Sequence, residues 1–180
     1  AAELTAGKYG ARALTADEGG LAPPFPNAVA MLEDAVRSIE RAGFKPGSEV
    51  ALAVDVASTH FFENGVYRMG ASSLNSAEMV EQLAGWVSQY PIVSLEDGLA
   101  EDDWDSWPTL RERVGNRTRV VGDDLLCTNP DRIRRAIQAN AADTLLLKVN
   151  QIGTVSEAAE ACQLARSAGW QVTVSARSGE

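Results

Sequence analysis

The chain has 180 residues and carries 16 basic against 25 acidic side chains, which gives a formal net charge of −9. This acidity argues against a nucleic-acid partner, because a phosphate backbone is bound by a basic surface. Hydrophobic residues make up 45% of the chain, enough for the core of a globular domain, and no apolar run reaches the length of a membrane span, so we expect no membrane partner.

From the N-terminus, the first pattern is helical. Residues Asn27–Ala42 carry apolar side chains at spacings of three and four, which predicts an amphipathic helix. Val50–Val56 is a short apolar run and predicts a strand. Asn64-Gly65 lies between apolar pairs and predicts a tight hairpin. Ser76–Tyr90 opens with a capping residue followed by acids, which predicts a second helix.

The rest of the chain alternates between strands and helices. Pro130 after Asn129 is a common helix entry, and Gly169 is a common helix exit. The predicted elements are strands at Ile92–Leu95, Arg119–Val121, Thr144–Leu147 and Gln171–Val174, and helices at Pro130–Ala139 and Thr154–Ala168.

The alternation predicts an α/β fold. The strands are nearly continuous apolar runs, which is typical of a parallel sheet with helices against it. Such units form either a (β/α) barrel or a doubly wound sheet. No glycine-rich GxGxxG loop follows a strand, which weighs against a dinucleotide fold. We therefore expect part of a TIM-type barrel, with about five strand–helix units.

Charged residues stand at the end of each of the first four predicted strands. Asp55 ends the first, Glu96 the second, Asp123 the third and Lys148 the fourth. In a barrel these ends meet at one mouth, where active sites are built. Three carboxylates from three strands form a set of oxygen ligands that suits Mg²⁺. The sequence therefore predicts a magnesium site.

A simpler interpretation exists for each acid alone. An acid after a strand is more often a helix cap or loop residue than a ligand. This applies to Asp55 by itself, and to Asp97 and Asp124 as capping or supporting groups. The recurrence of acids at three strand ends favours the metal. The sequence leaves open whether Asp123 or Asp124 is the direct ligand. Asp123 comes first at the strand end, which would leave Asp124 to orient Lys148.

Lys148 follows three consecutive leucines. Apolar surroundings disfavour the charged form of an amine, so a lysine here suits the role of general base. The more common fate of a lysine is to reach the surface with its ammonium in water. Its position on the same mouth as the acids favours the base.

Six segments carry a resemblance to one family. They are Asp17–Pro23 (DEGGLAP), Val54–Ser58 (VDVAS), Ser94–Asp97 (SLED), Val121–Leu125 with Thr128–Pro130 (VGDDL and TNP), Leu146–Gly153 (LLKVNQIG) and Val174–Glu180 (VSARSGE). In this order they resemble motifs of the C-terminal barrel domain of enolase, the phosphopyruvate hydratase of glycolysis and gluconeogenesis. The resemblance covers residues 17–180, and LLKVNQIG is its most specific part.

The resemblance implies a lyase that dehydrates 2-phospho-D-glycerate, a small phosphorylated hydroxy acid, to phosphoenolpyruvate with Mg²⁺ as cofactor. It also allows a homodimer of the intact parent protein. The roles that it implies are metal ligands at Asp55, Glu96 and Asp123, a general base at Lys148, a general acid at Glu18, and phosphate binding at Arg177 and Ser178. A guanidinium fork suits a pair of phosphate oxygens.

The chain also departs from the family. Ala176 stands where the family has histidine, Gly98 where it has proline, and His60, the one histidine, where it usually has glutamate. We expect residues 1–180 to be an incomplete enolase-like barrel domain that lacks the N-terminal domain and the last barrel strand. Isolated, it should have little or no activity. The alternatives are a divergent enolase-superfamily enzyme and a non-catalytic protein that retains the metal site.

The two cysteines indicate the compartment. Cys127 and Cys162 lack a metal-type spacing, and two cysteines cannot form a disulfide framework. A reducing cytoplasm is therefore the expected location.

Overall fold

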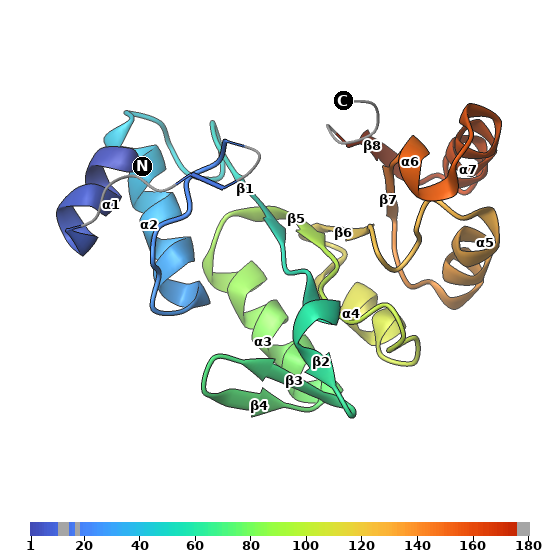
Figure 1. The fold of residues 1–180 in the computed structure, drawn as a ribbon, viewed down its shortest axis with the longest axis horizontal. Coiled ribbons are helices and arrows are strands. Elements are labelled where there is room, and N and C mark those ends of the chain that lie inside the picture. The colour runs from blue at the N-terminus through green and yellow to red at the C-terminus, as the bar shows by residue number, and fades with distance from the viewer. Residues whose placement is uncertain (11–14, 17–18, 176–180) are drawn as a thin grey trace. The chain divides into compact units, whose positions relative to one another are not determined.

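The structure is a computed structural model that describes residues 1–10, 15–16 and 19–175 (Figure 1). The chain forms two compact units, Ala1–Leu52 and Ala53–Glu180. The helices are α1 (Ala2–Tyr9), α2 (Ala28–Arg41), the 3-10 turn η1 (Ser58–Phe61), α3 (Ser76–Gln89), α4 (Trp107–Val114), α5 (Pro130–Ala139), α6 (Val149–Ile152) and α7 (Val155–Ser167). The strands are β1 (Leu52–Asp55), β2 (Phe62–Glu63), β3 (Val66–Met69), β4 (Ser72–Leu74), β5 (Ile92–Glu96), β6 (Arg119–Gly122), β7 (Thr144–Leu147) and β8 (Gln171–Val174).

The first unit is held together by a buried carboxylate. Asp34 of α2 is 1% exposed and accepts hydrogen bonds from Lys8 Nζ at 2.8 Å and Tyr9 Oη at 2.9 Å, both from the last turn of α1. Burial acts to raise the pKa of Asp34, but these two donors outweigh it and hold the pKa below its usual value. The side chain of Asn27 caps α2 by accepting from the backbone N–H of Ala30.

The second unit contains a five-stranded sheet in the order β1-β5-β6-β7-β8. The pairs β5–β6, β6–β7 and β7–β8 are parallel. Parallel connections are right-handed, and strands that follow one another across the sheet therefore place their helices on the same face. Figure 1 shows α3, α4, α5 and α7 gathered along that side of the sheet. The fold confirms the predicted α/β class and is consistent with part of a TIM-type barrel.

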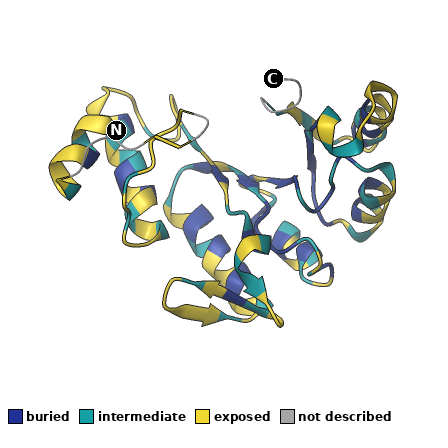
Figure 2. Ribbon diagram, viewed as in Figure 1, coloured by how far each residue is buried: buried dark blue, intermediate teal, exposed yellow. Residues whose placement is uncertain are grey.

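The core lies between the sheet and these helices, where Figure 2 shows the buried residues of both. Helix α3 illustrates why the sequence folds in this way. Its N-terminus is closed by a capping box, in which Asn75 accepts from the backbone of Glu78 and Glu78 accepts from the backbone of Asn75. Its apolar stripe of Met79, Leu83 and Val87 is 3% exposed or less, as its helical spacing predicts.

The segment between β1 and α3 forms a small antiparallel sheet in the order β2-β3-β4. Asn64 and Gly65 have φ values of 54° and 78°, which a two-residue hairpin turn requires, so the predicted hairpin is confirmed. His60 lies exposed in η1. Tyr67 of β3 is fully buried and fixes the loop after β5, because its hydroxyl donates to Asp103 Oδ2 at 2.7 Å and accepts from the backbone N–H of Ala100 at 3.0 Å.

The five predicted strands and four predicted helices are all present, and their ends shift by a few residues at most. The sequence interpretation missed α1, η1, α4, α6 and β4. Within the described residues, no helix has the length and apolar character that crossing a membrane requires.

Candidate metal centre

Strands β1, β5, β6 and β7 deliver charged side chains to the same edge of the sheet. Asp55 and Glu96 are the last residues of β1 and β5, Asp123 follows β6 directly, and Lys148 follows β7 directly. A backbone hydrogen bond joins the ends of β1 and β5, because the N–H of Val56 donates to the Glu96 carbonyl at 2.9 Å. The structure therefore brings together four predicted site residues at the ends of neighbouring strands. They are Asp55, Glu96, Asp123 and Lys148.

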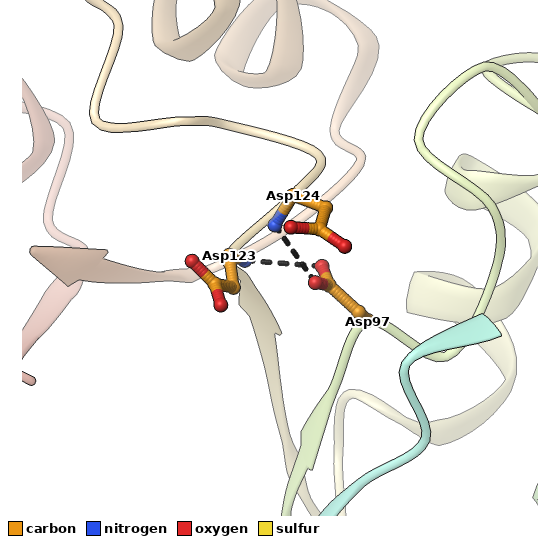
Figure 3. A group of neighbouring side chains, drawn as sticks. All are labelled: Asp97, Asp123 and Asp124. Atoms are coloured by element: carbon orange, nitrogen blue, oxygen red, sulfur yellow. Dashed lines mark hydrogen bonds between the residues drawn. The ribbon is translucent and has the colours of Figure 1, made fainter. Parts of the chain in front are cut away.

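The Asp97 carboxylate fixes the backbone at the start of the loop after β6. Its carboxylate accepts the backbone N–H of Asp123 at 3.0 Å through Oδ1 and that of Asp124 at 2.7 Å through Oδ2, as drawn in Figure 3. Asp97 is 2% exposed and has a φ of +41°, a strained value for a side chain other than glycine. Its role as a support, which the sequence left open, follows from these two bonds.

Oxygen atoms of Asp97, Asp123 and Asp124 lie within 4.8 Å of one another and could hold a metal ion. In Figure 3 the Asp123 carboxylate turns away from Asp97. Both oxygens of Asp97 already accept a backbone hydrogen bond, and Asp97 is almost without solvent access. Each oxygen of Asp123 also accepts one hydrogen bond, from Gln151 or Lys148, so the hydrogen bonds do not rank the two acids; the two backbone bonds make Asp97 a support for the loop that carries Asp123.

Asp55 and Glu96 add negative charge beside this cluster. Burial, followed by the charges of Asp55 and Asp123, raises the pKa of Glu96 to about 7. Desolvation by the surrounding chain also raises the pKa of Asp55, although the residue as a whole is exposed; a hydrogen bond from the backbone N–H of Ala57 at 3.0 Å opposes the rise, and the charges of Asp123 and Asp124 add to it. Burial raises the pKa of Asp97 to about 7, although two backbone donors oppose it.

Lys148 supplies positive charge to this group of acids. Its side chain is buried, with the whole residue 6% exposed, and its Nζ donates to Asp123 Oδ2 in a short ion pair. We expected Asp124 to orient Lys148. In the structure Lys148 pairs with Asp123, and no hydrogen bond or ion pair joins it to Asp124 although the structure describes both residues, so an orienting role of Asp124 stays a prediction. The loop after β6 is turned by Asp97 so that Asp123 receives the ammonium.

The donor set fits a divalent cation. The ammonium of Lys148 pairs with Asp123 and also acts on the charges of Asp55 and Glu96, while Asp97 and Asp124 cluster with Asp123. Burial is the main reason that the pKa values of Glu96 and Asp97 are raised, and the charges of neighbouring acids add to the rise in both. Oxygen ligands in such number suit a hard cation such as Mg²⁺ or Ca²⁺.

Two residues of the site were not predicted from the sequence. Gln151 Nε2 donates to Asp123 Oδ1 at 2.7 Å, and Thr128 Oγ1 donates to Gln151 Oε1 at 2.8 Å. Both residues lie inside segments that the sequence interpretation quoted, TNP and LLKVNQIG. The signal that could have found them is a polar side chain in the segment that follows a strand, since these segments build the mouth.

Three predicted site residues, Glu18, Arg177 and Ser178, lie outside the described residues, as does Ala176. The loop beside Glu18 is partly described. The backbone N–H of Gly19 donates to the Ala16 carbonyl at 2.9 Å, and that of Ala16 to the Gly20 carbonyl at 2.8 Å. Gly19 has a φ of +79°, which this tight turn needs and glycine adopts without strain.

The comparison with known families agrees with this geometry. The family model described as enolase, C-terminal TIM barrel domain, matches residues 2–180. Because the match extends over almost the whole chain and the carboxylates and the lysine gather at the strand ends, the chain belongs to the enolase C-terminal TIM barrel family.

Proposed function

We propose that this chain provides the metal-binding and proton-abstracting part of an enolase, which dehydrates 2-phospho-D-glycerate to phosphoenolpyruvate. The observation that carries the proposal is the buried pair of Lys148 and Asp123 at the ends of adjacent parallel strands. A lysine is rarely buried unless it is paired. The partner here is Asp123, one of the acids that could bind a cation. The proposed base therefore contacts a proposed metal ligand directly.

Mg²⁺ is the cofactor that this proposal names, and Asp55, Glu96 and Asp123 are the residues that would hold it. A bound divalent cation would supply the positive charge that stabilises a carboxylate substrate as it loses its α-proton and becomes a dianion. Enolase-superfamily sites in general use a lysine or histidine base together with Mg²⁺, and the assignment follows that known pattern.

Lys148 is the proposed base. To accept a proton from the substrate, the Lys148 ammonium must first release its own proton and part from Asp123 Oδ2. Asp123 keeps its orientation when this happens, because Gln151 holds its other oxygen at 2.7 Å. Asp97 in turn fixes the backbone of Asp123. The chain's own residues therefore hold the base and the carboxylate in place before substrate arrives.

The remaining roles rest on the family resemblance. Glu18 is the proposed general acid for the departing hydroxide, and Arg177 and Ser178 are the proposed phosphate contacts. A small phosphorylated hydroxy acid is thus the proposed partner, in the cytoplasm, with a homodimer as the proposed assembly of the parent protein.

A second candidate is a divergent or non-catalytic enolase-superfamily protein that retains the metal site. Ala176 favours it, because a methyl group stands where the family motif has histidine. An alanine can neither donate a hydrogen bond to substrate nor transfer a proton.

Lys148→Ala in the parent protein separates the two candidates. If Lys148 is the base, the variant should lose about 10²-fold to 10⁴-fold in kcat for 2-phosphoglycerate, which is the usual contribution of a general base. An unchanged kcat, or a parent protein without turnover, would contradict the enolase assignment and favour the second candidate. Lys45→Ala, at an exposed lysine in the first unit, is the matched control and should leave kcat unchanged.

A further inference from the structure

Thr128 and Gln151 connect the backbone of Lys148 to the carboxylate of Asp123. The backbone N–H of Lys148 donates to Thr128 Oγ1 at 2.9 Å, Thr128 Oγ1 donates to Gln151 Oε1 at 2.8 Å, and Gln151 Nε2 donates to Asp123 Oδ1 at 2.7 Å. The Lys148 ammonium donates to Asp123 Oδ2, which completes a ring of hydrogen bonds. The base and the carboxylate are therefore held by one ring of four hydrogen bonds.

The direction of each bond in this ring is fixed by chemistry. An ionised carboxylate only accepts, so the Gln151 atom that faces Asp123 must be its NH₂ group. The Gln151 carbonyl oxygen then faces Thr128, whose hydroxyl must donate its single hydrogen there. The Leu146 carbonyl, at 3.4 Å from the same hydroxyl, is the weaker acceptor. Thr128 keeps its lone pairs for the Lys148 N–H, so no other arrangement satisfies all members.

Thr128 is placed in this ring by an unusual backbone. It is fully buried, and both Cys127 and Thr128 have left-handed φ values, of 47° and 52°. A β-branched residue rarely adopts this region, and strain of this kind persists where the surrounding structure over-determines it. The two left-handed residues turn the chain back after β6 and bring the Thr128 hydroxyl within reach of Gln151 in α6.

We infer that Thr128 and Gln151 are positioning residues, which set the orientation of the Asp123 carboxylate for the cation and hold it relative to Lys148. This inference rests on the proposed function, because it assigns the ring a role at the proposed metal site. Gln151 occupies one lone pair of Oδ1 and Lys148 one of Oδ2, and each oxygen keeps a further lone pair for a cation. Without the ring, the Asp123 side chain could rotate away from that orientation.

The test measures Mg²⁺ affinity by calorimetry on the 180-residue chain, with Thr128→Val, Thr128→Ser and Gln151→Met. Loss of a group that orients a metal ligand typically weakens metal affinity by about 10-fold to 100-fold. We expect this loss for Thr128→Val and Gln151→Met. Thr128→Ser keeps the hydroxyl and should keep the affinity of the unchanged chain. Gln151 is only half-buried, so its variant tests the ring even if Thr128→Val does not fold.

Thr118→Val is the matched control. Thr118 is 4% exposed, and its hydroxyl has no hydrogen-bond partner among the described residues, so this variant makes the same change in a buried site outside the ring. It should bind Mg²⁺ as the unchanged chain does. Unchanged affinity in both Thr128→Val and Gln151→Met, or equal losses in Thr128→Ser and Thr128→Val, would overturn the inference and leave the proposed function standing. If the unchanged chain bound no Mg²⁺, the proposed metal site would fail and the inference with it.

Discussion

Lys148 and Asp123 leave the ends of adjacent parallel strands and form an ion pair that is almost closed to solvent. The relationship is unequal, because the Lys148 ammonium faces a group of carboxylates while Asp123 is one acid among five. Replacing Lys148 by a neutral residue therefore leaves more uncompensated charge than replacing Asp123 does. This asymmetry makes the energetics of the pair testable.

Lys148→Met should destabilise the metal-free chain by about 3–5 kcal/mol, the usual cost of removing one partner of a buried ion pair. Asp123→Asn should cost less, because it also relieves repulsion among the neighbouring acids. Urea unfolding at pH 7 in the presence of a chelator measures both. Equal losses, or a larger loss in Asp123→Asn, would contradict the electrostatic description of the site.

The stability of the metal-free chain should fall as pH rises from 5 to 8. Glu96 and Asp97 have pKa values of about 7, against ordinary values of 4.5 and 3.8. In this window the folded chain holds protons that the unfolded chain has released, so raising the pH favours unfolding. The stability contributed by these groups is thus present at low pH and is lost as pH passes through about 7.

Thermal unfolding in a chelator, from pH 5 to pH 8, checks this expectation. Glu96→Gln should flatten the dependence of Tm on pH, since an amide does not titrate. Saturating Mg²⁺ should also flatten it, because a cation stabilises the ionised carboxylates. A Tm that rises with pH in the chelated protein would show that the assigned pKa directions are wrong.

Tyr67→Phe should reduce the free energy of unfolding by about 1–3 kcal/mol, the cost of leaving buried polar groups unpaired. The substitution removes the hydroxyl that joins Asp103 to the backbone of Ala100. Tyr67→Phe keeps the ring that packs on Phe62 of the neighbouring strand β2, so the loss reports the hydroxyl; Phe62→Leu measures separately what that ring packing contributes. If Tyr67→Phe is as stable as the unchanged chain, the loop after β5 is held by other contacts.

Two glycine substitutions should change stability in opposite directions. A Cβ at Gly122, just before Asp123, would lie 2.5 Å from Leu126 Cγ, so Gly122→Ala should cost about 1–3 kcal/mol through overpacking. Gly85 lies in α3, where a Cβ would meet only the end of Gln89 at 3.9 Å. Gly85→Ala should therefore stabilise by about 0.5–1 kcal/mol through helix propensity. Chemical denaturation of both variants tests the packing behind the site.

The strand ends could be predicted from the sequence because their signal is local. Each of β5, β6 and β7 is a short apolar run with charged residues directly after it, and parallel strands bring such residues to one edge. Helix α4 was missed because its eight residues make only about two turns, although Trp107, Leu110 and Val114 are buried at spacings of three and four. Helix α6 is a single turn, too short to show a period.

The ring around Asp123 could not be predicted for a different reason. It depends on Cys127 and Thr128 adopting left-handed backbone conformations, which neither residue type favours. The surrounding packing imposes them. Sequence spacing likewise left open whether Asp123 or Asp124 is the direct metal ligand, because the direction of each carboxylate depends on how Asp97 holds the backbone of both residues.

The measurement that tests the proposed metal centre most directly is calorimetric titration of the 180-residue chain with Mg²⁺ at pH 7.5, beside Asp123→Asn. We predict binding in the micromolar to millimolar range for the unchanged chain, as expected for a site of carboxylate oxygens, and no binding for the variant. Equal binding by both proteins, or none by either, would contradict a metal centre built on Asp123.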